Sequence, residues 1–557
     1  IGDWCELSKN IYLKKKNFEY FDFYKWNNFK QKSLDAKFII QSYKYFLKVL
    51  TKNLNYIHKK KEKEEFWEIL LSRWLFSYIH NLYSRWQVVQ KIKNSFRIES
   101  IITNQYNNFN FIPNNTQDSH WMMMSPNNID WNTSIFNEIF KFFYKDTISF
   151  RFLPKLKVLK NNFNFFNTIY YSNVINFSLK RKIFFYNLSL DRKIKFSLMI
   201  QNSFLNFQLK KRDKIIDRGI NYDLRNQLDK KRKRTKNKFY EFIYRDIKYR
   251  LPKIFLENFK DLEDTYRVLN WPKKPEYILS SYAQYYDEVF KYYCAKKIQK
   301  TKLLILQHGY SNIFADKDFY AGFMDKKIST NFLTWGKNFK DNSKPFVFPM
   351  KSFINNKINL NKKIIFIIYA FNEKPYLPIN GFINGNQRNI KTIKLVESFM
   401  NNSKNQIKKN SYAKLMSNSI VDSVKKSIKF KFPNLRFIDT KKNYSQVINK
   451  FNISIHFFLG TPFFESMHHN KPCILILERE IHLNFDKNFS SVIKDLKKNK
   501  ICFEKIDEAT NFVNKNYDDI ISWWEKNDVQ KSREKFCEKY CRRFDQNKNV
   551  LKKIFKN

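Results

Sequence analysis

Short apolar runs alternate with amphipathic stretches through the second half of the chain, and this alternation constrains the fold more than any other feature. The apolar runs predict strands at 277–279, 303–306, 331–335, 363–369, 435–438, 453–459 and 473–477. The amphipathic stretches predict helices at 284–299, 389–400, 412–429 and 444–451. The uninterrupted run 364–368 is typical of a strand buried on both faces of a parallel sheet. We therefore predict an α/β protein with two lobes, whose ligand crevice lies at the carboxyl ends of the strands.

The domain boundaries follow from where this pattern begins, breaks and ends. We predict an N-terminal lobe over 1–345, a C-terminal lobe over 346–520 and a C-terminal helix over 521–557 that packs back on the N-terminal lobe. Ahead of the first sheet, local composition predicts a mostly helical stretch over 1–100, a loop-like Asn-rich stretch over 101–150, short strands over 151–200 and a charged helical stretch over 205–250.

The chain is strongly basic, with 104 Lys and Arg against 51 Asp and Glu and a formal net charge of +53. Such an excess is typical of proteins that bind nucleic acid, anionic membranes or anionic substrates. The charge is spread along the chain, and its densest run, 230–234, is short, so a basic solvated surface explains it as well. A basic nucleic-acid-binding protein remains the non-enzyme alternative.

The cysteines and the hydropathy indicate a compartment. The six cysteines are scattered and show neither a disulfide framework nor zinc-ligand spacing, which favours a reducing, intracellular environment. No run of about 18 uncharged apolar residues is present, so we expect no transmembrane helix. We expect a cytoplasmic protein, with peripheral contact to the anionic inner membrane as an option.

The segment 457–467 carries the strongest local signal for a ligand site. An apolar run ends at Gly460, Thr461 is a good N-cap and Pro462 a good first helical residue. The exposed N–H groups and the helix dipole then form an anion site suited to a phosphate or diphosphate. Glu465 lies one turn further, where its carboxylate can accept hydrogen bonds from ribose hydroxyls. An ordinary capped helix with an exposed Glu would produce the same local pattern.

A second candidate is the loop Gln307-His308-Gly309-Tyr310, which follows a predicted strand. A histidine at the carboxyl end of a strand is well placed as a general base, because its unperturbed pKa is about 6.5. A loop histidine that bonds to backbone is the structural alternative.

Glycine positions are informative because the chain has only eight. Gly309, Gly336 and Gly460 each follow a predicted strand, where glycine permits close approach of a ligand to backbone N–H groups. A tight turn would explain any one of them as well. Asp316 and Asp318 form a D-x-D pair, but this spacing arises often by chance, so we predict no metal site.

Four stretches together resemble a family of bacterial transferases linked to surface-carbohydrate biosynthesis. In chain order they are Gly2-Asp3-Trp4-Cys5; Gln307-His308-Gly309-Tyr310 with 332–336; 460–465 with Asn470-Lys471-Pro472; and Trp523-Trp524 with Val529, Gln530, Arg533, Phe536, Cys537 and Tyr540. They lie in order over nearly the whole chain.

This family is similar to glycosyltransferases of the metal-independent GT-B architecture, in which two Rossmann-like lobes face a central cleft. The resemblance implies that the C-terminal lobe binds a nucleotide sugar through Gly460, Thr461 and Glu465, and that His308 is the catalytic base on the acceptor side. An Arg-rich strand end is expected in the C-terminal lobe, and here Arg388 and Lys409 are its nearest substitutes. Gln307, Gly309, Tyr310 and Gly336 would line the cleft.

The resulting hypothesis is a glycosyltransferase that moves a sugar from a nucleotide-activated donor to a cell-surface polysaccharide or glycolipid. The donor is a substrate, and no separate cofactor or metal is expected. Teichoic-acid polymerases have a related His-Gly loop, so a CDP-polyol phosphotransferase remains the alternative enzyme.

Overall fold

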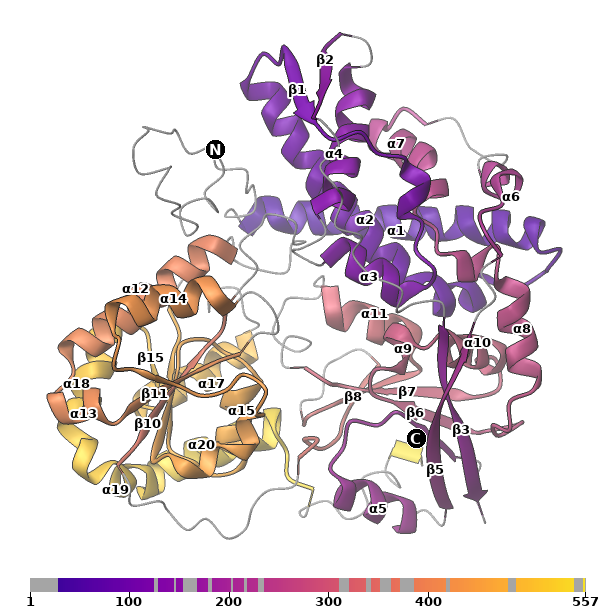
Figure 1. Cartoon of the computed structure of the whole chain (residues 1–557). Helices are drawn as coiled ribbons and strands as arrows, with labels where there is room; N and C mark the ends of the chain where they lie inside the picture. Colours follow the sequence, from indigo (N-terminus) through magenta and orange to yellow (C-terminus); the bar gives the residue numbers. More distant parts are fainter. Residues whose placement is uncertain are drawn as a thin grey trace.

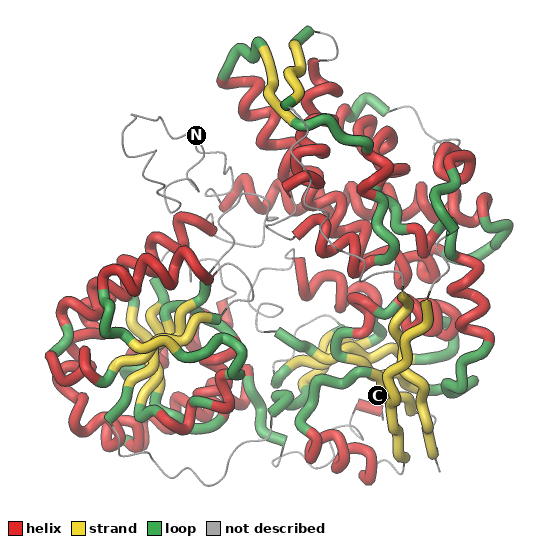
Figure 2. Tube along the Cα trace, viewed as in Figure 1, coloured by secondary structure: helices red, strands yellow, loops and turns green. Residues whose placement is uncertain are grey.

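Two parallel sheets with flanking helices form two lobes, and a layer of long helices lies over the first lobe (Figure 1). Figure 2 shows the two larger sheets in separate places, each bordered by helices, and a further short pair of strands at the top of the view. The predicted two-lobed α/β fold is thereby confirmed. The computed structural model describes residues 29–124, 129–144, 147–153, 168–178, 183–201, 204–214, 218–228, 235–309, 320–336, 342–350, 362–370, 385–416, 421–478, 487–544 and 554–555.

The first sheet has five parallel strands in the order β4-β6-β7-β8-β9. Their bounds are β4 (Ile183–Tyr186), β6 (Tyr277–Ser280), β7 (Lys302–Leu306), β8 (Asn331–Thr334) and β9 (Ser343–Pro345). Successive side chains point to opposite faces. Leu303 and Ile305 therefore join the core beneath the helical layer, whereas Leu304 and Leu306 join a smaller core on the other face, beside α5 (Arg192–Gln201).

The helix predicted over 284–299 is divided in two by Asp287. Helix α9 (Ala283–Tyr286) ends before it, and α10 (Glu288–Lys297) begins after it. The Asp287 carboxylate caps α10 by accepting a hydrogen bond from the backbone N–H of Phe290 at 2.8 Å. This local capping bond outweighs the continuous amphipathic pattern.

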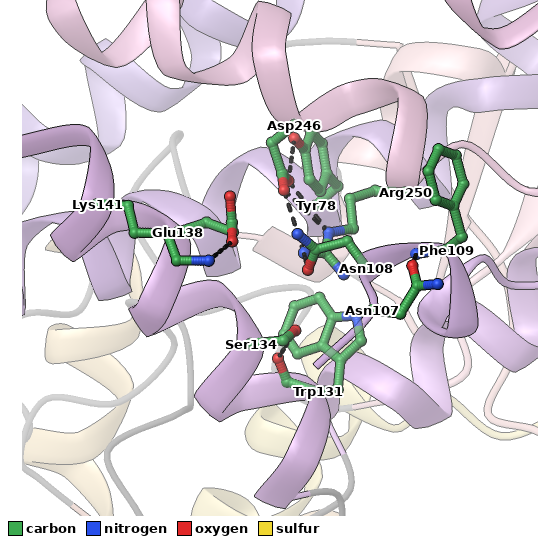
Figure 3. A network of polar contacts seen from close by, with 10 residues as sticks. All are labelled: Tyr78, Asn107, Asn108, Phe109, Trp131, Ser134, Glu138, Lys141, Asp246 and Arg250. Carbon is green, nitrogen blue, oxygen red and sulfur yellow. Dashed lines mark hydrogen bonds and ion pairs between the residues drawn. The ribbon is translucent and has the colours of Figure 1, made fainter. Parts of the chain in front are cut away.

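The helical layer is built on two long helices, α1 (Phe29–Ile57) and α2 (Glu64–Ser95). Four shorter helices share its core: α3 (Thr116–Met124), α4 (Ile129–Tyr144), α7 (Lys238–Asp246) and α8 (Phe259–Arg267). Helix α2 is buried over most of its length, so its polar side chains need partners inside the protein. Figure 3 shows one such group: Tyr78 donates to Asp246 at 2.9 Å, and Arg250 donates to the same carboxylate at 3.1 Å. This network ties α2 to the end of α7.

Two predictions for this region are wrong, and a third, short strands over 151–200, fails at its end, where α5 begins at Arg192. The stretch 101–150 was predicted to be loop-like but contains α3 and α4, because Trp131, Ile135 and Ile139 form a buried face at helical spacing. The stretch 205–250 was predicted to be helical, yet it begins with β5 (Phe204–Lys214), which pairs antiparallel with β3 (Thr168–Ser178). Pairing with a strand distant in sequence overrides local preference here. A further short parallel pair joins β1 (Ser100–Thr103) to β2 (Ser149–Phe152).

The second sheet has six parallel strands in the order β12-β11-β10-β13-β14-β15. Their bounds are β10 (Ile364–Ile368), β11 (Ser411–Leu415), β12 (Arg436–Phe437), β13 (Ile453–His456), β14 (Cys473–Ile476) and β15 (Cys502–Phe503). The helices of this lobe are α12 (Gly385–Asn402), α13 (Asn405–Lys409), α14 (Val421–Lys431), α15 (Thr461–His468), α17 (Lys487–Lys498) and α18 (Ile506–Asn516). Phe366 and Ile367 face different cores, as expected for a strand buried on both faces.

The helix predicted over 412–429 is wrong in its first part. Residues 411–415 form β11, which pairs with β10 along its whole length, and α14 begins only at Val421. The helix predicted over 444–451 consists instead of two 3-10 turns, η7 (Tyr444–Gln446) and η8 (Ile448–Lys450). Strand β15 went unpredicted because two residues carry no periodic pattern.

The end of the described chain contacts both lobes. Helices α19 (Ile520–Glu525) and α20 (Asn527–Tyr540) pack on the core of the second lobe. After α20, the backbone N–H of Arg542 donates to the carbonyl of Trp335 in the first lobe at 2.8 Å. Phe555 packs on the first sheet, where its carbonyl accepts from Tyr277 at 3.1 Å. The return to the first lobe is thus made by the residues that follow α20.

Hydropathy of the observed helices bears on membrane insertion. Across the part of the chain that the structure describes, none of the helices combines the length and the apolar character that crossing a bilayer requires.

Candidate functional site

The loop between β13 and α15 has little room for side chains at Gly460. Gly460 is the N-cap of α15, and a Cβ atom added there would lie 1.9 Å from the ring of Phe458. Thr461 is the first helical residue and makes no capping hydrogen bond, so the prediction that it is the N-cap is wrong. The cap position needs a residue without a side chain, which excludes Thr. A bare helix start at the carboxyl edge of a parallel sheet offers N–H groups and a positive dipole end to an anion.

Glu465 lies on this helix, one turn after Thr461. Its exposed fraction is only 7%, and Oε2 has no hydrogen-bond partner among the residues that the structure describes. Burial raises the pKa of the Glu465 carboxyl to about 8. A buried, unsatisfied carboxyl is costly, and such groups are retained more often at ligand sites than elsewhere.

The residues beside Gly460 lie at the carboxyl ends of neighbouring strands. Tyr369 follows β10, and its ring centroid lies 5.1 Å from that of Phe458. Burial raises the pKa of Tyr369, and the nearby charge of Arg388 on α12 opposes this. Lys414, near the end of β11, is buried and donates to the carbonyl of Asp439 at 3.2 Å. Arg388 is therefore brought near the Gly460 loop, and Lys414 is an additional cation at the same edge.

Lys409 lies elsewhere. It ends α13 and stands two residues before β11, at the amino edge of the parallel sheet, whereas Gly460 follows the carboxyl edge. The structure does not bring Lys409 together with the other predicted donor-binding residues. Lys409 was chosen from the sequence as a substitute for an Arg-rich strand end, and Lys414 was missed because the strand that contains it was predicted to be a helix.

On the first lobe, Gln307 holds the loop that carries His308. Its Nε2 donates to the carbonyl of Gly309 at 2.9 Å, and its Oε1 accepts from the backbone N–H of Trp335 at 2.9 Å. The indole Nε1 of Trp335 donates in turn to the backbone carbonyl of Gln307 at 2.9 Å. The first bond lies within the loop after β7, and the other two join this loop to the one after β8. Gln307 is buried and has a positioning role in the structure.

His308 projects from this loop with more than a third of its surface exposed. Its ring centroid lies 5.0 Å from that of Tyr285 on α9. Desolvation by the surrounding protein, and then repulsion from Arg73 on α2, lower the pKa of His308 to about 4. His308 is therefore neutral at pH 7 and has a nitrogen lone pair available to accept a proton.

The two lobes meet beside these loops. The ring of Trp335, after β8, lies 6.0 Å from that of Phe464 on α15. Gly336 has a φ of +142°, and a Cβ atom there would lie 2.5 Å from the backbone oxygen of Glu538 on α20. The glycine at 336 is explained by this close approach between the lobes.

Several sequence predictions fall outside the described residues. These are Tyr310, the D-x-D pair Asp316 and Asp318, the stretch Gly2-Asp3-Trp4-Cys5 and the basic run 230–234. His456 is buried in β13, with Nε2 at 2.9 Å from the hydroxyl of Ser454 and with Nδ1 unpaired among the described residues.

Sequence analysis missed a group of residues around His308. Tyr285 donates to Asp325, which is buried on α11 (Tyr320–Ile328), at 2.5 Å, and the guanidinium of Arg73 lies 4.6 Å from the centroid of the Tyr285 ring. No local motif marks them, since Arg73 lies more than 200 residues from Tyr285 in the sequence.

Comparison with known proteins was made on the sequence and on the fold. A family described as "LIC12162 family transferase" matches residues 1–555. None of the curated protein sequences compared with the chain matches it.

Solved structures align with parts of the chain. MurG of Acinetobacter baumannii aligns at 7% identity and a TM-score of 0.30, over 54% of this chain and 76% of MurG. The pneumococcal O-GlcNAc transferase GtfA, in complex with UDP and GlcNAc, aligns at 11% identity and a TM-score of 0.32, over 53% of this chain and 58% of GtfA. Anabaena HepE, in complex with UDP-glucose, aligns at 8% identity and a TM-score of 0.34, over 67% of this chain and 99% of HepE.

Proposed function

The chain belongs to the LIC12162 family of transferases, and from this premise we propose that it moves a glycosyl group from a nucleotide-activated sugar to a cell-surface polysaccharide or glycolipid. In this proposal the second lobe binds the donor and the first lobe binds the acceptor. The reaction forms a bond between the acceptor oxygen and the anomeric carbon, breaks the bond from that carbon to the diphosphate, and transfers the acceptor's hydroxyl proton to a base.

The donor is proposed to bind at the start of α15. Negative charge grows on the diphosphate as the glycosyl bond breaks, and preorganised N–H groups at a helix start stabilise such charge. Gly460 and Thr461 would lie against the diphosphate, and Arg388 and Lys414 would add positive charge from the neighbouring strands. Glu465 would accept hydrogen bonds from the ribose hydroxyls.

His308 is proposed as the general base. A neutral imidazole at pH 7 can accept the acceptor's proton as its oxygen attacks the sugar. The Gln307 bonds to the loops after β7 and β8 support this role, because they fix the backbone on both sides of His308. A base that is held in position needs no reorganisation when the substrate arrives.

The single observation that carries the proposal is the buried Oε2 of Glu465, which lacks a hydrogen-bond partner among the described residues and lies one turn from a helix start. A polar ligand that donates hydrogen bonds would satisfy this atom. A ribose has two adjacent hydroxyls that can do so, while its phosphates reach the helix start.

The test is a thermal-shift screen with UDP, GDP, CDP, CMP and dTDP, each with magnesium and with EDTA. A ligand at 100 times its Kd adds about 2.7 kcal/mol to the free energy of unfolding, which is readily detected. We expect one nucleotide to stabilise the wild type in EDTA and to have no such effect on Glu465→Ala. Glu508→Ala, a change at an exposed Glu of the same lobe, is the control and should respond like the wild type.

The outcomes separate the alternatives. Stabilisation that requires magnesium would contradict the metal-independent mechanism. Absence of a shift with every nucleotide would contradict the donor site. The products then distinguish the two enzyme classes. Glycosyl transfer from a nucleoside diphosphate sugar releases the nucleoside diphosphate, whereas polyol-phosphate transfer from a CDP donor releases CMP.

A cytoplasmic location with peripheral contact to the inner membrane belongs to the same proposal. A lipid-linked acceptor would lie at that surface, and the net charge of +53 favours adsorption to anionic lipids. Sedimentation with vesicles of phosphatidylglycerol, but not with vesicles of phosphatidylcholine, is the expected result. Binding to duplex DNA that persists in the His308→Ala variant and falls steeply with salt would favour the nucleic-acid alternative.

A further inference from the structure

A row of aromatic rings leads away from His308 along the first lobe. The ring of His308 lies 5.0 Å from Tyr285, whose ring lies 6.0 Å from Tyr286. The Tyr286 ring lies 6.2 Å from His120, and His120 lies 6.4 Å from Trp121. Five rings from three separate parts of the sequence thus form a continuous series that starts at the proposed base.

The outer part of this row is open to solvent. Trp121 on α3 is 47% exposed and Tyr286 on α9 is 39% exposed. The His120 ring lies between these two exposed rings, and an exposed patch of this kind often marks a binding site. A pyranose ring has an apolar C–H face that packs on an aromatic ring, while its hydroxyls stay in contact with water and polar groups. The row therefore suits a saccharide.

The inner part of the row is rigid. The hydroxyl of Tyr285 donates to the buried carboxylate of Asp325 at 2.5 Å, and Gln284 donates to the same carboxylate at 3.0 Å. These bonds fix the Tyr285 ring between Arg73 and His308. A rigid ring at this point holds a bound saccharide at a set distance from the base.

Arg73 gives the row its charge. It projects from α2, half-buried, with its guanidinium 4.6 Å from the centroid of the Tyr285 ring. Its positive charge adds to desolvation in lowering the pKa of His120 to about 3 and of His308 to about 4. Both imidazoles are therefore neutral at pH 7 and can donate a hydrogen bond without adding charge. Nδ1 of His120 is buried and has no hydrogen-bond partner among the described residues.

We infer that the row from Trp121 to His308, together with Arg73, is an acceptor subsite for a saccharide that carries a negative charge. The exposed rings of Trp121 and Tyr286 bind the sugar faces, the buried Tyr285 positions the groups beside it, and Arg73 binds a carboxylate or phosphate close to the attacking hydroxyl. This inference rests on the proposed function and adds the class of acceptor to it. A carboxylate would belong to an acidic sugar, and a phosphate to a phosphorylated or lipid-phosphate-linked one.

The test is calorimetric titration of the full chain with three probes. They are a hyaluronan tetrasaccharide, which carries carboxylates; N-acetylglucosamine 1-phosphate, which carries a phosphate; and chitotetraose, which is neutral. We expect at least one charged probe to bind 10-fold or more tightly than chitotetraose, and the preferred probe identifies the charged group. Arg73→Gln should abolish this preference and Arg73→Lys should keep most of it. Trp121→Ala should weaken every saccharide that binds.

Two variants serve as matched controls. Arg267→Gln removes an exposed Arg of the same lobe, and Phe430→Ala removes an exposed aromatic ring of the other lobe. Both should bind the probes like the wild type. Nucleotide-induced stabilisation, retained in Arg73→Gln, shows that the variant is folded and that the donor site is intact.

Three results would overturn the inference. These are equal affinity for charged and neutral probes, an unchanged preference in Arg73→Gln, and no binding of any charged probe. If nucleotides still stabilise the protein in these cases, the acceptor subsite is rejected while the proposed donor site stands. If charged saccharides bind but nucleotides do not, the proposed transferase function fails instead.

Discussion

Trp335 in the first lobe and Phe464 in the second lobe have ring centroids 6.0 Å apart. Each ring is adjacent to a proposed functional residue, because Trp335 bonds the backbone of Gln307 next to His308, and Phe464 precedes Glu465 in α15. The ring contact between the lobes therefore lies beside both proposed functional residues, His308 and Glu465. A displacement at this contact would move the proposed base His308 together with Glu465, the residue proposed to bind the ribose.

Replacing Gln307 with Leu tests the first half of this relationship. The change leaves the buried N–H of Trp335 without its acceptor, which costs about 1–3 kcal/mol in the free energy of unfolding. We expect kcat to fall on the order of 10-fold because the His308 loop loses its fixed position, while nucleotide affinity stays unchanged. Urea denaturation, steady-state kinetics and nucleotide titration measure the three quantities. Gln299→Leu, at an exposed site of the same lobe, should change none of them.

Glu465 predicts an unusual dependence of stability on pH. Its pKa is about 8 in the folded protein and rises there from an ordinary value of 4.5, so between these values only the unfolded chain loses the proton. The wild type should therefore lose stability as pH rises through this window, by roughly 3 kcal/mol at pH 7 at 1.36 kcal/mol per pKa unit. Glu465→Gln is neutral in both states and should be the more stable protein at pH 8 but not at pH 4.5.

Denaturant titrations of both proteins at several pH values measure this difference. Glu508→Gln, at an exposed Glu, should keep the wild-type pH dependence. Parallel stability curves for the wild type and Glu465→Gln would contradict the burial of an unsatisfied carboxyl. The same variant should bind the nucleotide more weakly, so stability and ligand affinity change in opposite directions.

The pH dependence of activity should report His308. Because its pKa is about 4, kcat/KM should stay constant on the acid side until the pH approaches 4. Arg73→Gln removes one of the two causes of this low pKa, so the acid limb should move upward toward 6.5. His308→Ala should lower kcat by about 10²–10⁴-fold and leave nucleotide binding intact. Arg267→Gln should leave the profile in place, and a limb that shifts equally in that control would reject the role of Arg73.

Two glycines with positive φ, Gly336 and Gly219, allow the cost of backbone strain to be measured apart from the cost of a steric clash. Gly336→Ala meets the Glu538 backbone oxygen at 2.5 Å, whereas no atom of the described residues lies within 4 Å of a Cβ at Gly219. Both substitutions impose a left-handed backbone on Ala, at a cost of about 1–2 kcal/mol. We expect Gly336→Ala to cost a further 1–3 kcal/mol or so, because α20 must move away from β8. Differential scanning calorimetry measures both, and equal losses would exclude a tight contact between the lobes.

The sheets were predictable because buried parallel strands are apolar over four or five residues. The strands around Leu304, Phe332, Phe366, Ile455 and Leu475 were all found in this way. Strand β11 was not, since Tyr412 and Lys414 interrupt its apolar character and resemble a surface helix. Lys414 donates to the carbonyl of Asp439, which follows β12, and such a tertiary contact leaves no trace in local sequence.

The candidate site was predictable only where it is local. Gly460 and Glu465 lie within six residues, and the order of strand, glycine and helix brought them together on the sequence alone. Arg73 and Tyr285 meet because the helical layer folds over the first sheet. One cation among 104 Lys and Arg cannot be selected by composition.

The path of the chain after α20 has a consequence for synthesis and for proteolysis. Ile554 and Phe555 complete a core on the first sheet that contains Leu304 and Leu306, although more than 200 residues, the second lobe among them, lie between Leu306 and Ile554 in the sequence. A nascent chain therefore cannot finish its first lobe until residue 555 has left the ribosome, and the exposed apolar face must be protected during that interval. In the finished protein the chain passes from the first lobe to the second and back again, so one proteolytic cut between the lobes leaves them tethered.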